Sequence, residues 1–280
     1  MRGVSKHYAH VRGGRDRRRM KGQVVGWFAA LLASLAIPYC SSISTKPFVH
    51  PKEYVGHLDN IPVRVPRPYA RFISYDGKPG FLEKYLGRQP KRNFQSGING
   101  FAFEVHYPDL AVRDFLQPEA TPKETISDSR WLRVSLVANS HFSVASDVYM
   151  ARQNERIKLT GIYRDVPLDA PVYDLKAYRP SDEHPEVVKN RYVGMGGENK
   201  YLDIGADGKT LTYITCSNRE YASSPCTMSF TLDPAIHARI EVTFRKGLLE
   251  NWKEIRAAAS NIVLGFRVAD HPQQVQTGAR

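Results

Sequence analysis

The sequence predicts an α+β protein built mainly from antiparallel strands, with two sheet-bearing lobes and an amphipathic C-terminal helix packed on the second lobe. Three observations support this fold class: short runs in which apolar and polar residues alternate, frequent turn residues (20 Gly and 18 Pro), and one long segment with apolar residues at helical spacing. The 280 residues are 42% hydrophobic and 24% charged, which is typical of a globular protein. A mean hydropathy of -0.42 argues against a multi-spanning membrane protein.

Residues 1–40 are expected to hold a basic segment followed by a signal peptide. A cluster of Arg and Lys residues precedes the apolar run at 24–37, and small residues such as Ala36 end that run. This three-part pattern is typical of a secretory signal, and cleavage after Ala36 would place the mature protein in the periplasm.

Two alternatives at the N-terminus stay open. The apolar run could be retained as an inner-membrane anchor, and Met20 could be the true start, with residues 1–19 not translated. A lipid on Cys40 is disfavoured, because Tyr39 rather than a small residue precedes it.

The positive charge is concentrated before the globular part. The formal net charge is +12, but residues 1–40 contain eight basic residues and one acidic residue. Residues 41–280 therefore keep 32 basic and 27 acidic residues, a net charge of +5. A mildly basic surface of this kind gives little support to nucleic-acid binding, so no nucleic-acid partner is expected.

The first half of the chain is divided into a leader and a lobe. Residues 41–69 form a Pro-rich extended leader, in which 61–69 suit an edge strand or a polyproline stretch. The first β-rich lobe covers residues 70–155, and the lobes divide near residues 148–164. Its expected elements are strands at 70–75, 101–107 and 132–136, a turn at Asp76-Gly77 and a loop at 118–129.

The second β-rich lobe covers residues 156–268, and a flexible tail follows at 269–280. Its helix is expected over 247–266, with one apolar face. The helix must cover the preceding strands, which offer the largest apolar surface. The apolar face consists of Leu248, Trp252, Ile255, Ala259, Ile262 and Phe266. The expected strands lie at 156–163, within 167–178, and at 201–204, 210–215, 228–232 and 239–244, with an acidic loop at 182–186 and a turn at Asp207-Gly208.

Cys216 and Cys226 are predicted to form a disulfide across the base of a β-hairpin. Ten positions separate them, and each is flanked by a strand-like run, so paired strand positions bring them within bonding distance. A metal pair would need further ligands nearby, and a redox pair favours a two-residue spacing. A disulfide also fits an oxidising compartment.

The sequence contains no catalytic arrangement that we recognise. No Gly-x-Ser-x-Gly motif occurs, and no His pairs with another His or Cys at ligand spacing, so neither catalytic residues nor a metal or cofactor is expected. A binding protein is therefore favoured over an enzyme. The expected contact residues for a partner lie in two loops: Gly194, Gly196, Gly197 and Lys200 in the first, and Arg219 and Tyr221 in the second.

The C-terminal block, residues 238–255, reads ARIEVTFRKGLLENWKEI. This strand followed by Leu-Leu and by Trp-Lys-Glu-Ile on a helix resembles exported immunity proteins of type VI secretion effectors, including those for lipase-type toxins. The resemblance implies a periplasmic, non-enzymatic protein whose partner is a cognate toxin, neutralised by occlusion of its active-site cleft. It transfers no site residue, because the matching positions are core positions. The alternatives are a secreted enzyme acting on cell-envelope material and a membrane-anchored structural component of an envelope complex.

Overall fold

The computed structural model describes residues 51–77, 91–116, 129–138, 164–185, 188 and 197–268. The chain divides into two units, Met1–Phe48 and Val49–Arg280, and only the second contains described residues. The predicted signal peptide and C-terminal tail lie outside the described residues, so both stay predictions.

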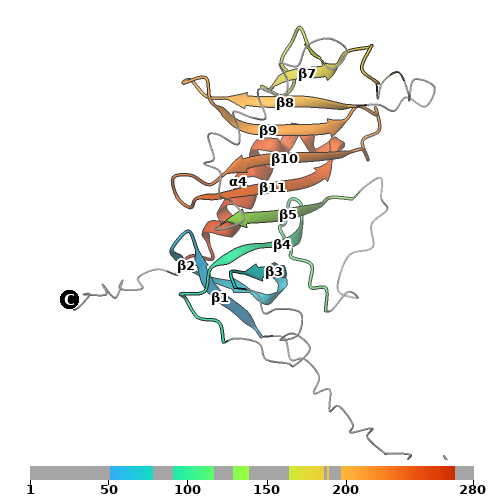
Figure 1. Cartoon of the computed structure of the whole chain (residues 1–280). Helices are drawn as coiled ribbons and strands as arrows, with labels where there is room; N and C mark the ends of the chain where they lie inside the picture. The colour runs from blue at the N-terminus through green and yellow to red at the C-terminus, as the bar shows by residue number, and fades with distance from the viewer. Residues whose placement is uncertain are drawn as a thin grey trace, which may run out of the picture. The chain divides into compact units, whose positions relative to one another are not determined.

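Nine strands form one antiparallel sheet in the second unit (Figure 1). Strands from both predicted lobes belong to it, because β5 pairs directly with β11. The predicted boundary at residues 155/156 falls outside the described residues. In sheet order the strands are β3 (Arg71–Tyr75), β4 (Ile98–His106), β5 (Trp131–Ala138), β11 (Ala238–Arg245), β10 (Pro225–Thr231), β9 (Thr210–Ser217), β8 (Glu198–Ile204), β7 (Lys176–Pro180) and β6 (Asp165–Pro167).

One face of the sheet carries the main core, as the alternating sequence predicts. Successive residues of a strand point to opposite faces, so every second residue of β4, β5, β10 and β11 points towards the helix. Phe103, Val134 and Val242 lie opposite one another through the strand registers and are fully buried. The helix α4 (Trp252–Leu264) lies across this face, behind the central strands in Figure 1. The predicted α+β class, with its C-terminal helix packed on the sheet, is confirmed.

The helix begins later than the sequence indicates, and its buried face is slightly rotated. A 3-10 helix, η6 (Lys246–Asn251), occupies the first turns. Leu249 and Val263 are buried, whereas the predicted Leu248 and Ile262 are only partly buried. A 3-10 helix has three residues per turn, which rotates its faces relative to an α-helix. Val263 follows Trp252 by eleven residues, about three α-helical turns, so both face the sheet.

In the described part of the chain, we find no helix with the length and apolar character that crossing a membrane requires.

A two-stranded hairpin, β1 (Glu53–Leu58) and β2 (Ile61–Pro66), lies in the described part of the predicted leader. The edge strand predicted near residue 61 is therefore present, and β1 is an additional strand. The hairpin is joined to the end of the helix region, because the Arg64 amide donates to the Phe266 carbonyl at 2.8 Å. Gly56 permits a close approach to the start of β4, since a Cβ there would lie 2.6 Å from the Ser96 carbonyl oxygen.

Candidate functional site at the disulfide-closed end of the sheet

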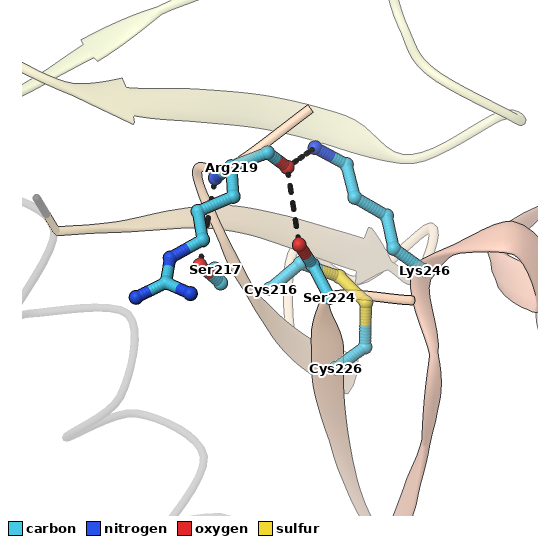
Figure 2. The surroundings of a disulfide bond; sticks show 6 residues. All are labelled: Cys216, Ser217, Arg219, Ser224, Cys226 and Lys246. Atoms are coloured by element: carbon cyan, nitrogen blue, oxygen red, sulfur yellow. Dashed lines mark hydrogen bonds between the residues drawn. A yellow bond between two sulfur atoms is a disulfide. The ribbon is translucent and has the colours of Figure 1, made fainter. Parts of the chain in front are cut away.

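The predicted disulfide joins Cys216 of β9 to Cys226 of β10 (Figure 2). The two residues are directly opposite in the strand register, and their Cα atoms lie 4.0 Å apart. Both side chains are buried on the helix-covered face. The cross-link therefore closes the hairpin from the core side and leaves residues 217–225 as a short loop at the end of the sheet.

Hydrogen bonds fix this disulfide loop from within and from η6. The Arg219 carbonyl accepts hydrogen bonds from Lys246 Nζ at 2.8 Å and from Ser224 Oγ at 3.5 Å (Figure 2). The Gly247 amide donates to the Ala222 carbonyl at 2.9 Å. A loop held at both sides is well suited to present side chains in one geometry.

Tyr221 is the most exposed aromatic side chain that the disulfide loop presents, with 69% of its surface accessible. Tyrosine offers a large apolar ring and a hydroxyl group at a low entropic cost, and it is common where proteins bind one another. The loop therefore has the properties of a contact surface on a rigid scaffold.

The structure brings one of the predicted glycines to the disulfide loop. The Asn218 amide donates to the Gly197 carbonyl at 3.4 Å, and Gly197 has a φ of 80°, a left-handed conformation that favours glycine. Gly194 and Gly196 lie outside the described residues. The two predicted contact loops thus meet at Gly197, while their role in partner binding stays a prediction.

Lys200 is placed within β8 rather than in the glycine loop. Its ammonium group forms an ion pair with the carboxylate of Asp165 in β6, whose side chain is only 2% exposed. A buried carboxylate needs such a partner, so Lys200 has a structural role in addition to the predicted contact.

A cluster of arginines lies beside this loop and was not predicted from the sequence. The Glu104 carboxylate accepts hydrogen bonds from Arg113 at 2.7 Å, from Arg133 at 3.0 and 3.1 Å, and from Arg71 at 3.4 Å. Arg245 lines the same cavity and donates to the Ser223 carbonyl of the disulfide loop at 2.9 Å. These residues come from distant parts of the chain, and no local motif unites them.

The groups at this end of the sheet are suited to binding a partner. They offer guanidinium and ammonium donors, an exposed phenol and aromatic rings. Within the residues that the structure describes, no group of three or more His, Cys, Asp and Glu side chains could hold a metal ion.

Three comparisons with known proteins give the following results. No protein-family model matches the sequence, and a search of curated proteins finds no match. Among solved structures, the chain is similar to an immunity protein of the Stenotrophomonas maltophilia type IV secretion system, with 13% identity and a TM-score of 0.49. The match covers 78% of this chain and 94% of that protein. That protein is described with a type IV system, whereas the sequence led us to expect a type VI system.

Proposed function

We propose that this protein is a periplasmic, non-enzymatic binding protein that neutralises a secreted antibacterial toxin by covering its active-site cleft. The resemblance of residues 238–255 to exported immunity proteins supports this function and implies a lipase-type toxin of a type VI system. Secretion through the inner membrane follows from the predicted signal peptide, and the disulfide is consistent with an oxidising compartment.

The observation that carries the proposal is the disulfide loop. It is short, cross-linked at its base and held by Lys246, and it projects Tyr221 into solvent. A pre-organised loop loses little conformational entropy on binding, which favours tight association with a concave partner such as an enzyme cleft.

The test begins with affinity capture from a periplasmic extract under non-reducing conditions. Intact masses of the bait and of any captured protein would identify both chains, and a bait that begins after residues 36–40 would establish signal cleavage. The captured protein is then purified, and its hydrolase activity is measured with and without one equivalent of this protein. We expect a one-to-one complex in which that activity is lost.

Substitutions at the two ends of β9 test the disulfide loop as the contact surface. Arg219 follows β9 in the disulfide loop, and Lys209 precedes β9 in the turn at its other end. We expect Arg219→Glu together with Tyr221→Ala to weaken the complex at least about tenfold, as loss of central contact residues does. Lys209→Glu should leave the affinity unchanged. Turnover of lipid or glycan by this protein itself would overturn the proposal in favour of an envelope-directed enzyme.

A further inference from the structure

A cavity of about 310 Å³ lies beside the disulfide loop on the sheet face opposite helix α4, and we call this face the open face. We define the arginine pocket as the Glu104 carboxylate, the three arginines paired with it (Arg71, Arg113 and Arg133), and Arg245 and the indole of Trp131 in the cavity wall. Four positive charges face one negative charge in this pocket. Glu104 is 7% exposed in its side chain and cannot neutralise them all.

Two of the guanidinium groups, those of Arg71 and Arg113, stack on aromatic rings, which holds them in place. The Arg71 Cζ atom lies 3.8 Å from the ring centre of Phe115 and 4.6 Å from that of Phe72. The Arg113 Cζ atom lies 4.1 Å from the ring centre of Trp131. Stacking of this kind reduces the entropy that an arginine loses when it binds a ligand.

Donors in the arginine pocket exceed the acceptors. Each guanidinium carries five N–H groups, whereas Glu104 and the Ser223 carbonyl accept only a few of them. Arg113 Nε and Trp131 Nε1 are buried and have no hydrogen-bond partner among the described residues. Unpartnered buried donors are rare in folded proteins, so an external acceptor group would complete this site.

An exposed aromatic residue marks the border of the pocket. Phe72 is 76% exposed and has a φ of 56°, at an irregularity of β3 between Arg71 and Ser74. A bulge re-aims side chains, and a large side chain seldom adopts a left-handed conformation. Apolar rings beside arginines are typical of protein-binding surfaces and give no advantage for binding a free inorganic anion.

We infer that the arginine pocket binds a carboxylate side chain, Asp or Glu, presented by an acidic segment of a protein partner. The fork of a guanidinium matches the two oxygens of a carboxylate, and several such forks converge in one cavity. The inference rests on the proposed function in one respect: the protein partner is taken to be the toxin. The pocket and the disulfide loop then form one continuous contact surface, joined at Arg245.

The test uses a defined probe and no toxin. An acetylated and amidated peptide, Gly-Asp-Glu-Asp-Gly, is titrated into the purified protein, and the indole N–H resonance of Trp131 is followed by NMR after its assignment with Trp131→Phe. The neutral peptide Gly-Asn-Gln-Asn-Gly and inorganic phosphate are titrated in parallel. We expect saturable shifts with the acidic peptide and none with the neutral one.

Three variants separate binding from a structural role. Arg133, whose side chain is 62% exposed, should tolerate Arg133→Ala, and this change should raise the peptide Kd at least about tenfold. Glu104→Gln removes the competing carboxylate and should lower the Kd several-fold. Arg179 pairs with Asp182 at a distant edge of the sheet, so Arg179→Ala should leave the Kd unchanged.

The outcomes are distinguishable from those for the proposed function. Absence of a Trp131 shift, equal affinity for phosphate, or weaker peptide binding by Glu104→Gln would each overturn the pocket, even where a toxin is captured. Peptide binding that is weaker in Arg133→Ala, tighter in Glu104→Gln and unchanged in Arg179→Ala would support the pocket, even where no toxin is found.

Discussion

The two faces of the nine-stranded sheet are stabilised by different interactions. Phe103 and Glu104 are neighbours in β4 and point to opposite faces. Phe103 is fully buried beneath the helix region and contacts the rings of Tyr69, Phe101 and Phe266. Glu104 is buried beneath arginines, with no element of regular structure across it among the described residues.

The interactions that stabilise the fold lie on the helix-covered face, whereas the groups that could recognise a partner lie on the open face. The helix-covered face gains free energy from apolar area removed from water, which is independent of any partner. The open face keeps excess positive charge and unused donors close to solvent, which contribute little to folding and are available to a ligand. Changes on the two faces should therefore have separable effects, and four predictions test that separation.

The largest expected effect is on the helix-covered face. Phe103→Ala should lower the free energy of unfolding by about 3–5 kcal/mol, because it removes a fully buried ring and leaves a cavity. The measurement is chemical denaturation followed by circular dichroism. Phe72→Ala is the matched control, because this exposed ring should contribute less than about 0.5 kcal/mol. Equal losses for the two variants would contradict the assignment of the core.

The disulfide should have the next largest effect. Replacing Cys216 and Cys226 together by Ala should lower the free energy of unfolding by about 2–3 kcal/mol, because the unfolded chain gains the entropy of an open loop. Denaturation of the wild-type protein with and without reductant gives an independent measurement. The double variant itself should not respond to reductant, and a response would point to an effect other than the disulfide.

Glu104→Gln should lower the free energy of unfolding by about 2 kcal/mol, because four hydrogen bonds from three arginines lose their negatively charged acceptor while the arginines remain partly hydrated. The same variant should bind the acidic peptide more tightly. Loss of stability with gain of binding would sharpen the contrast between the two faces. Loss of both would overturn the arginine pocket as a carboxylate-binding site.

The sequence predicts one face much better than the other, for a physical reason. Alternation and helical spacing are local, so the strands predicted at 101–107 and 239–244 and the C-terminal helix are present, although the α-helix covers residues 252–264 instead of 247–266. The disulfide is also local, since a single hairpin pairs its cysteines. Two positions of the predicted apolar face shift, from Leu248 to Leu249 and from Ile262 to Val263, because in each case the next residue is also apolar.

The arginine pocket depends instead on pairings across the sheet. Arg133 reaches Glu104 because β5 pairs with β4 in a register that places the two residues opposite each other. Arg71 lies opposite Ala102 in the pairing of β3 with β4. Nothing local encodes these registers, so a reader of the sequence sees only separate arginines. Such a site follows from topology and not from a motif.

The smallest effect concerns Tyr75, which joins β3 to the hairpin over the covered face. Its hydroxyl donates to the Val55 carbonyl at 3.0 Å, and Tyr75→Phe should lower the free energy of unfolding by about 1 kcal/mol at pH 8. Burial raises the pKa of the Tyr75 phenol to about 12, although the neighbouring Arg92 charge lowers the pKa in part. The neutral phenol is thus favoured by folding.

This contribution should therefore be complete below pH 10, where the phenol is neutral in both states, and should decline as the pH rises from 10 to 12. Denaturation curves at pH 8, 10 and 11.5 should show the wild-type protein losing its advantage over Tyr75→Phe. Tyr221→Phe, at an exposed position, should follow the wild-type curve throughout. A constant difference between wild type and Tyr75→Phe would mean that Tyr75 titrates normally, and that the hairpin leaves this part of the core open to water.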